Sequence, residues 1–312
     1  MDLIYQGPSE RVDIWLTKQF PYTRSFFHHI IARGGIQILG KAVKKSYILK
    51  NGDQIHVDDL QRYLGSEILE ETPKIDIPIV LEKEEYLIIN KPKGVLSHPR
   101  NLRELNEPSV VGFLYHTYKD LPSIGNFIRA GLLHRLDKET DGLMIIAKTE
   151  KGLAHFKNLF DEKTKKAGEI GGLTGDGEIY TPSNLQVSSE FPNLLQKFYR
   201  AGCHITPEGE KFLESIQLPY YIQEPVIAKI PYTTPKMGIT KILNSKKSDH
   251  TVILELEILT GRTHQIRYHL AHHGLPIIGD YLYGKDEGIP MQLTAYKLIF
   301  KDPNDEIMTI EI

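Results

Sequence analysis

A carboxylate follows a guanidinium at a spacing of two residues within HRLDKETDGLMIIAKT, residues 134–149. The pair is Arg135 and Asp137, and the apolar run after it predicts a strand, so both are expected in a loop held by a rigid scaffold. A carboxylate in such a loop can act as a nucleophile or as a base, but burial alone raises the pKa of an aspartic acid and neutralises it. An isolated Asp–Arg pair on a surface contributes little, so Asp137 needs a further cation if it is to react as an anion.

A candidate for that cation, Arg267, lies in EILTGRTHQIRYHLAHHGLPIIGDYLYG, residues 257–284. The pattern predicts a strand, then a helix with Thr263 as its N-cap and Gly274 as its stop, and then a second apolar stretch. Ile266 and Arg267 leave a helix about 100° apart, so Ile266 can be buried while Arg267 reaches a cleft. We therefore expect Arg267 to keep Asp137 ionised.

The same helix carries histidines, of which His269 and His273 are spaced i, i+4 as in some metal sites, with His272 beside them. No Glu lies between the pair as in metalloprotease helices, so structural histidines are favoured and no metal site is predicted. Glycoside hydrolysis is a second alternative for Asp137, but that chemistry normally needs another carboxylate about 5–9 Å away. Here Arg and Tyr residues are the candidate partners instead.

The chain has 312 residues, of which 40% are hydrophobic and 25% are charged. Such values are typical of a globular protein with one large domain and a smaller one. No apolar run approaches the roughly 18 residues that span a bilayer, and the single cysteine, Cys203, excludes an internal disulfide framework. These features predict a cytoplasmic protein with no membrane partner.

Charge is unevenly distributed along the chain. Residues 1–65 contain nine Lys or Arg against six Asp or Glu, a net charge of +3, whereas residues 66–90 contain two against seven, a net charge of −5. Residues 91–312 balance at 27 each. Because the acidic stretch SEILEETPKIDIP is typical of a domain connector, we predict a basic module at 1–65, a linker at 66–79 and a catalytic domain at 80–312.

Two short amphipathic helices are expected in the basic module. ERVDIWLTKQF places Val12, Trp15 and Leu16 on one face, and TRSFFHHIIARGG predicts a second helix with Thr23 as its N-cap and a Gly-Gly stop. The second apolar face comprises Phe26, Phe27, Ile30 and Ile31. IQIL, a GK turn and DQIHV then predict a small β element.

The strings RVD-x-x-L, T-R-S, G-x-x-x-x-G-K and L-K-x-G-D-x-I resemble the αL-type RNA-binding module of a small-subunit ribosomal protein, over residues 9–57. The resemblance implies that one helix face and the adjoining loop approach an RNA backbone, with Lys and Arg supplying the salt-sensitive part of the affinity. A solvated basic surface with no ligand is the alternative. The candidate RNA-binding residues are Arg11, Arg24, Lys41, Lys44 and Lys45.

Three strings in the larger domain, KPKG, HRLDKETDGLMIIAK and GRTHQIRYHLAHHGLPIIGDYLYG, resemble the signatures of the RluA-type RNA pseudouridine synthases over most of residues 80–300. The resemblance implies an α+β fold, in which a small N-terminal α/β RNA-binding module precedes a catalytic domain with a mixed, largely antiparallel sheet. It also implies a cofactor-free isomerase that detaches uracil from its ribose, rotates it and reattaches it through carbon five. The expected substrate is structured RNA, with large-subunit ribosomal RNA favoured over transfer RNA, and the protein is expected to be a monomer.

The same resemblance implies roles for particular residues. A uridine must leave the base stack before a protein group can reach its anomeric region. Arg135 matches the family residue that fills the vacated position, and Asp137 matches the carboxylate that attacks the sugar or removes a sugar proton. Tyr199 matches the family aromatic, because Lys197, Tyr199 and Ala201 form its K-x-Y-x-A string. The other residues expected at the RNA or the flipped base are His134, Arg262, His264 and Gln265.

A divergent insertion is predicted near residues 164–195, because this polar, Gly-rich stretch is far longer than the usual connection. Its GGLTGDG lacks GK[ST] and a preceding apolar strand, which favours a flexible loop over a phosphate-binding loop. Tyr180 lies within it but outside any K-x-Y-x-A string. Asp141 stands where the family usually has a small hydroxyl residue, and residues 202–250 match loosely. A catalytically inactive RNA-binding protein on the same fold is the alternative function.

Overall fold

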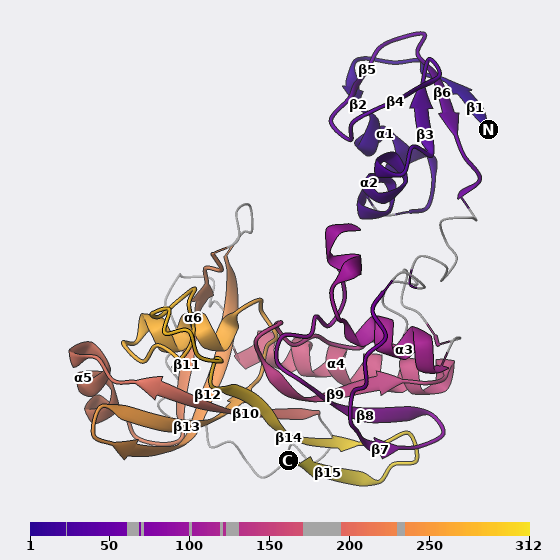
Figure 1. The fold of residues 1–312 in the computed structure, drawn as a ribbon. Coiled ribbons are helices and arrows are strands. Elements are labelled where there is room, and N and C mark those ends of the chain that lie inside the picture. The colour runs from indigo at the N-terminus through magenta and orange to yellow at the C-terminus, as the bar shows by residue number, and fades with distance from the viewer. Residues whose placement is uncertain are drawn as a thin grey trace. The chain divides into compact units, whose positions relative to one another are not determined.

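The computed structural model describes residues 1–22, 24–60, 69, 72–99, 102–118, 121–122, 131–170, 195–229 and 235–312 (Figure 1). The chain divides into two compact units. The first comprises Met1–Ile75, His98–Asp120 and Ile124–Ala130, and the second comprises Asp76–Ser97, Leu121–Ser123 and Gly131–Ile312. The predicted module at 1–65 lies within the first unit, which also gathers His98–Asp120 from inside the predicted catalytic domain.

The first unit begins with a module of two helices and a small sheet. The helices are α1 (Val12–Gln19) and α2 (Arg24–Ala32). The four-stranded sheet has the order β1 (Asp2–Ile4), β6 (Gln54–Val57), β3 (Ile36–Ile38) and β4 (Lys41–Ala42), and a ribbon joins β2 (Glu10–Arg11) to β5 (Ile48–Leu49). The predicted helices and β element are therefore present.

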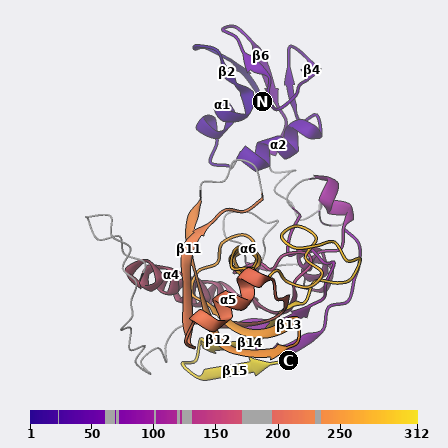
Figure 2. The ribbon, with the colours of Figure 1, turned by 90° about the vertical axis from the view of Figure 1, so that its left-hand side faces the viewer.

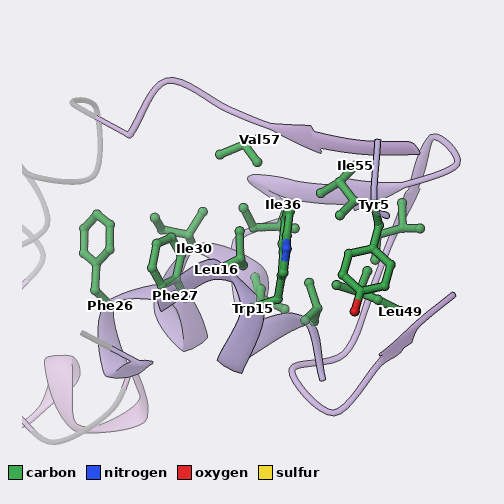
Figure 3. Close-up of a cluster of buried hydrophobic side chains, with 13 residues drawn as sticks. Tyr5, Trp15, Leu16, Phe26, Phe27, Ile30, Ile36, Leu49, Ile55 and Val57 are labelled. Atoms are coloured by element: carbon green, nitrogen blue, oxygen red, sulfur yellow. The ribbon is translucent and has the colours of Figure 1, made fainter. Parts of the chain in front are cut away.

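The predicted apolar faces of both helices form the core of this module (Figure 3). Leu16 of α1 and Phe27 of α2 are fully buried, and the ring of Tyr5 meets that of Trp15 edge to face at 5.7 Å between centroids. The predicted N-cap Thr23 lies outside the described residues. Helix α2 ends ahead of Gly34, whose φ of +77° suits a glycine, as the Gly-Gly stop predicts.

A 3-10 helix, η3 (Leu102–Asn106), and helix α3 (Val110–Tyr118) belong to the same unit. The ring nitrogen Nε2 of His116 lies 2.9 Å from the carbonyl oxygen of Thr72. Gly112 packs so closely that a Cβ there would stand 2.6 Å from the hydroxyl oxygen of Thr72. Through these contacts α3 packs against Thr72, which follows the N-terminal module in the sequence.

A mixed sheet of nine strands forms the second unit (Figures 1 and 2). Its strands are β7 (Ile79–Glu82), β8 (Tyr86–Lys91), β9 (Asp141–Ala147), β10 (Gln196–His204), β11 (Tyr220–Val226), β12 (Lys236–Ser248), β13 (Thr251–Ile258), β14 (Leu293–Lys301) and β15 (Ile307–Glu311). The order is β11-β12-β13-β10-β14-β9-β8-β7, and β15 pairs with β14. Of these pairings β14 with β9 is parallel and the others are antiparallel, which confirms the predicted α+β fold with a largely antiparallel sheet.

The second unit also contains helices α4 (Glu150–Ile170), α5 (Pro207–Ser215) and α6 (Gln265–His272). Helix α4 buries Phe156 and Leu159 against Tyr86 and Leu298 of the sheet. It continues through residues 164–170, which were predicted to belong to the insertion, because Lys, Ala and Glu there favour a helix. Among the described residues no helix is long and apolar enough to cross a membrane.

The two halves of the sheet meet at the parallel pairing of β9 with β14, where Thr294 lies opposite Asp141 and Ala295 opposite Gly142. Gly142 has a φ of +118°, and a Cβ there would stand 2.3 Å from the carbonyl oxygen of Ala295, so this close approach requires glycine. The hydroxyl of Thr294 donates to Oδ1 of Asp141 at 2.7 Å. The unusual carboxylate at position 141 therefore has its partner in the neighbouring strand.

Candidate active site

A cavity of about 300 Å³ is lined by residues 133–137 and 140, by α4, by β10 and by residues 258–267. It brings together every residue that was predicted for the catalytic domain's site. These residues are His134, Arg135, Asp137, Tyr199, Arg262, His264, Gln265 and Arg267. Three segments far apart in the sequence thus converge on one place.

The loop that carries Asp137 is held by the segment after β8. Ser97 Oγ donates to the carbonyl oxygen of Leu136 at 2.7 Å and accepts from its amide at 3.0 Å. The ammonium of Lys91, which is fully buried, donates to the carbonyl oxygens of Pro92, Val95 and Lys138. Lys91 of the KPKG string and Ser97, three residues beyond it, thus hold the backbone on the two sides of the carboxylate, a role that the sequence pattern did not predict.

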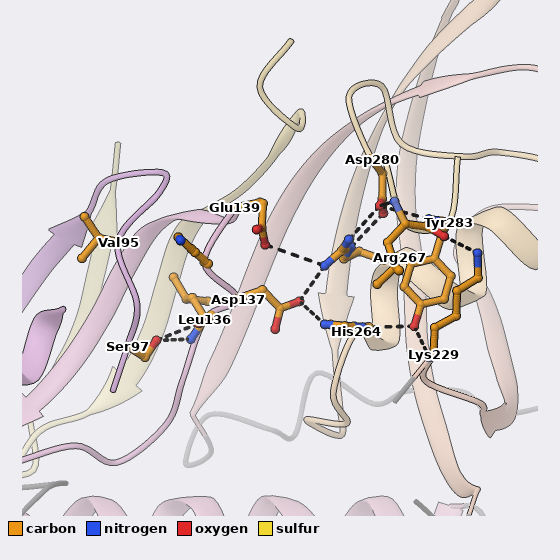
Figure 4. A network of polar contacts seen from close by, with 12 residues as sticks. Val95, Ser97, Leu136, Asp137, Glu139, Lys229, His264, Arg267, Asp280 and Tyr283 are labelled. Atoms are coloured by element: carbon orange, nitrogen blue, oxygen red, sulfur yellow. Dashed lines mark hydrogen bonds and ion pairs between the residues drawn. The ribbon is translucent and has the colours of Figure 1, made fainter. Parts of the chain in front are cut away.

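Arg267 lies between two sets of carboxylates (Figure 4). Its Nη1 is 3.6 Å from Oδ2 of Asp137 and 4.0 Å from Glu139, while its Nε and Nη2 donate to the two carboxylate oxygens of Asp280 at 2.8 and 2.7 Å. The Arg267 side chain is 2% exposed and that of Asp137 is 17% exposed. Asp280 therefore fixes the guanidinium, whose remaining edge faces the carboxylate at the cavity.

Asp280 lies in the string GLPIIGDYLYG, in which no pattern predicts that it pairs with Arg267. Burial raises the pKa of Asp280, but the hydrogen bonds and charge of Arg267 outweigh this and hold the pKa below its ordinary value. The amides of Leu282 and Tyr283 also donate to this carboxylate. A pair with this many partners keeps the arginine in one orientation.

His264 precedes α6 with a φ of +56°, in the left-handed region. It occupies the N-cap position and makes no side-chain cap bond, so the predicted Thr263 N-cap is wrong. Its Nδ1 lies 3.0 Å from the hydroxyl of Tyr283, and its Nε2 lies 3.9 Å from Asp137. The imidazole therefore faces Tyr283 and the carboxylate and does not cap the helix.

Two of the residues expected at the RNA are engaged inside the protein. The side chain of Gln265 accepts from Thr260 and from the Arg262 amide, and donates to Ile239 and Thr240. His134 Nε2 accepts from the amide of Ile145 at 3.0 Å. Gln265 therefore shapes the loop, whereas the side chain of Arg135 is exposed at the cavity.

Tyr199 lies on β10, where the register against β14 shifts between Phe198 and Arg200. Its side chain lines the cavity and is 5% exposed. Burial, together with the negative charge of Asp137, raises the pKa of its phenol, which therefore stays protonated near neutral pH. Tyr180, the other tyrosine considered, lies outside the described residues.

The histidines of α6 have protein partners. His269 is buried, and its two nitrogens lie 2.9 Å from Thr240 Oγ1 and 3.4 Å from the carbonyl oxygen of Glu224. His272 and His273 each lie 3.1 Å from the carboxylate of Glu224, and ligand atoms of these three residues fit within 4.8 Å. His269 is thus structural, while the carboxylate of Glu224 contacts both His272 and His273.

The candidate RNA-binding residues of the N-terminal module form two groups. Arg11 and Arg24 both bind the carboxylate of the fully buried Asp13, at 3.0 and 2.7 Å. Burial raises the pKa of Asp13, but hydrogen bonds from Arg11, His28 and Arg24 outweigh it and hold the pKa well below its ordinary value. Lys41, Lys44 and Lys45 are exposed. The lysines are thus available to solvent, whereas the arginines are anchored.

Comparison with known proteins assigns this fold to a class. A family model described as RNA pseudouridylate synthase matches residues 85–167. The solved structure of Human RNA Pseudouridylate Synthase Domain Containing 1 superposes with a TM-score of 0.50 at 18% identity, covering 76% of this chain and 83% of that one. The fold is therefore that of the RNA pseudouridylate synthases.

Curated relatives extend the match to nearly the whole chain. An uncharacterized RNA pseudouridine synthase of Aquifex aeolicus is 30% identical over 98% of this chain and 91% of its own length. The ribosomal large subunit pseudouridine synthase D of Pseudomonas aeruginosa is 28% identical over 90% of this chain and 76% of its own length. The chain belongs to the RNA pseudouridine synthase family, of the RluA type.

Proposed function

We propose that this protein converts uridine to pseudouridine in structured RNA, most favourably in large-subunit ribosomal RNA, with transfer RNA as the alternative substrate. The observation that carries the proposal is the ion pair of Asp137 with the buried Arg267, at 3.6 Å, beside Tyr199 in one cavity. Ribosomal RNA is proposed as the favoured substrate because relatives such as the Pseudomonas aeruginosa protein are named as ribosomal large subunit pseudouridine synthases. The cytoplasmic location and the monomeric state belong to the same proposal.

The chemistry assigned to these residues begins with a flipped uridine, because a stacked base shields its own anomeric carbon. Asp137 attacks the sugar or removes a sugar proton, and either step requires the anion that Arg267 stabilises. The C1′–N1 bond breaks and the uracil turns. A bond then forms from C5 to C1′ as Asp137 releases the sugar or returns the sugar proton. The C5 proton leaves and N1 takes up a proton, so the product is an isomer of the substrate. Arg135, exposed at the mouth of the cavity, supports the RNA at the position that the base leaves.

The direct test of activity maps pseudouridines in total RNA from cells with and without this protein. A position that is modified only when the parent protein is present supports the proposal. The competing function, an RNA-binding protein with an inactive site, predicts that the RNA is bound and that no position changes. Incubation of the purified protein with RNA from the deficient cells distinguishes the two functions directly.

Substitutions at Tyr199 test its assignment as the aromatic beside the base. Tyr199→Phe keeps the ring but loses a phenol that can relay a proton, so we expect a rate decrease of about 10²-fold. Tyr199→Ala also loses stacking, which contributes about 1–3 kcal/mol per base, and should be the poorer enzyme. Rates of pseudouridine formation with the mapped RNA measure both effects.

Tyr180→Phe and Tyr180→Ala serve as matched controls and should react at nearly the parent rate. If the Tyr180 variants fail while both Tyr199 variants react normally, the catalytic aromatic must be reassigned. That result would leave the pairing of Asp137 with Arg267 unaffected.

The N-terminal module is proposed to bind RNA through its exposed lysines. Replacing Lys44 and Lys45 together by Glu should weaken RNA binding and reduce the slope of log affinity against log salt, by about 0.7–0.9 for each phosphate that the protein no longer neutralises. Lys246→Glu changes an exposed lysine of the second unit and provides the control. Filter-binding titrations at several salt concentrations measure the slope. An unchanged affinity and slope in the double variant would assign the module another purpose.

A further inference from the structure

Two buried lysines and a half-buried histidine, whose ring nitrogen Nδ1 is itself buried, lie together in the active-site cavity. They are Lys163 of α4, Lys197 of β10 and His134 of the loop before Asp137, and all three line the cavity. Both lysines are 8% exposed. The ring of Phe160 lies 5.4 Å from the imidazole of His134 and 5.1 Å from the ammonium of Lys197, so these groups share one apolar wall.

Two of these groups have no hydrogen-bond partner in the described part of the chain. They are the ammonium Nζ of Lys163 and the ring nitrogen Nδ1 of His134. Because Nε2 of His134 accepts from the amide of Ile145, a neutral ring carries its proton on Nδ1 and offers it as a donor. Buried donors without acceptors are rare in folded proteins, so this arrangement needs a ligand or a functional reason.

The lysines are also electrostatically unfavourable where they lie. Burial lowers the pKa of Lys163 to about 8, against the opposing attraction of Glu257. Burial, and then the charge of Lys163, lowers the pKa of Lys197 to about 7. Burial and these two lysines hold the pKa of His134 well below its ordinary value. A site with these properties is prepared for an acceptor or an anion that enters from outside.

We propose that Lys163 and Lys197, with the Nδ1 proton of His134, bind the carbonyl oxygens of the flipped uracil and stabilise the base while it is detached. The inference deepens the proposed function and rests on it. Lys197 and Tyr199 are two residues apart on β10 and face the same side of the sheet, about 6–7 Å apart along the strand. A uracil beside Tyr199 therefore reaches Lys197.

The depth of the site selects the base over the RNA backbone as the occupant. A flipped nucleotide inserts its base into the pocket while its phosphates stay with the chain outside. Uracil presents two carbonyl acceptors, O2 and O4, whereas cytosine carries an amino donor in place of O4. A lysine that donates a hydrogen bond to O4 of uracil would face the amino group of cytosine, which cannot accept one. Lys163 and Lys197 therefore also discriminate against cytosine.

Charge development gives the lysines a catalytic effect as well. When the C1′–N1 bond breaks, its electron pair stays with N1, and the uracil becomes an anion whose charge spreads over O2 and O4. This holds whether Asp137 has formed a bond to the sugar or has taken a sugar proton. Lysine donors at the carbonyl oxygens, whose protonated form the developing negative charge favours, therefore stabilise the transition state more than the bound uridine.

The kinetic test uses Lys163→Met and Lys197→Met, which keep side-chain length and remove the charge. Acting on ribosomal RNA from cells that lack this protein, each variant should show a kcat at least about tenfold lower, with KM within about threefold of the parent. Lys197→Arg should recover part of kcat. The control is Lys157→Met, an exposed lysine on the same helix. Because each Met variant loses a buried, unpaired ammonium, its melting temperature should equal or exceed that of the parent. A low kcat in a variant with that melting temperature is then not caused by misfolding.

Two kinetic results would overturn the inference. One is a kcat within twofold of the parent in both Met variants. The other is a raised KM and a smaller salt slope with unchanged kcat, which would assign the lysines to an RNA phosphate. In either case the parent still isomerises its RNA, and the proposed function stands.

A second measurement does not depend on turnover. In the parent protein with ¹³C-labelled lysines, the Cε signals that disappear in the two Met variants should shift with uracil but not with cytosine or inorganic phosphate. A shift with phosphate alone, or no shift with uracil, contradicts the inference. If uracil shifts these signals while the parent isomerises no RNA, the base-binding site stands and the proposed function fails.

Discussion

Replacing Asp137 by Asn should reduce pseudouridine formation to background, a loss of at least about 10³-fold, as for other single residues that react with substrate. The amide has nearly the shape of the carboxylate and is still able to hydrogen-bond. It lacks the charge that attack on the sugar or proton removal requires. RNA affinity should stay within about twofold of the parent, because the lysines of the N-terminal module are unchanged. Single-turnover assays and binding titrations with the mapped RNA separate the two properties.

Glu139→Gln is the matched control for this substitution. Glu139 belongs to the same loop, and its carboxylate lies 4.0 Å from Nη1 of Arg267. If a carboxylate near the arginine were sufficient, the two variants would behave alike. We expect the Gln variant to react within a few-fold of the parent. Turnover by Asp137→Asn within tenfold of the parent would remove Asp137 from its assigned role.

Replacing Arg267 by Met should abolish activity and also destabilise the protein by about 3–5 kcal/mol, because it leaves Asp280 buried without its partner. The bidentate contact joins side chains that are 2% and 0% exposed. Arg267 holds the pKa of Asp280 below its ordinary value, so the pair's contribution is present at neutral pH and is lost as the pH falls below about 4. Urea unfolding at several pH values measures the loss and its dependence on pH.

The double variant Arg267→Met with Asp280→Leu separates stability from chemistry. It removes both charges, and replacement of a whole buried ion pair by apolar residues is often neutral or stabilising. Stability should return toward that of the parent, whereas activity should stay absent because Asp137 is left without its cation. Recovery of activity together with stability would show that Arg267 acts only on the fold.

Much of the site could be predicted from the sequence because its residues lie within the HRLD string, the K-x-Y-x-A string and the GRTHQIR string. Each string places its polar residues next to an apolar strand or helix, and packing of those elements then brings Asp137, Tyr199 and Arg267 to one cavity. The apolar faces of the two N-terminal helices could also be predicted, because the spacing of their apolar residues matches the helical period.

Other features depend on interactions that sequence patterns do not encode. Asp280 lies 13 residues from Arg267, and nothing in that spacing shows that the chain turns back to pair them. Lys163 borders the stretch predicted as an insertion, and its burial at the cavity was not predictable because lysines are rarely buried and the polar sequence there does not indicate a buried helix face. His264 replaces Thr263 at the helix start because the backbone enters the left-handed region there, which propensities do not predict for histidine.

The short parallel pairing between β9 and β14 forms the line along which the two antiparallel parts of the catalytic domain's sheet are joined. Asp137 is attached to one side of that line through β9, whereas Tyr199 and Arg267 are attached to the other through β10 and α6. Long antiparallel ladders lie on each side of it, whereas β9 and β14 are joined by only two facing residue pairs among the described residues. The placement of Asp137 against Arg267 therefore depends on the register of this junction, and Gly142 permits the close approach that sets the register.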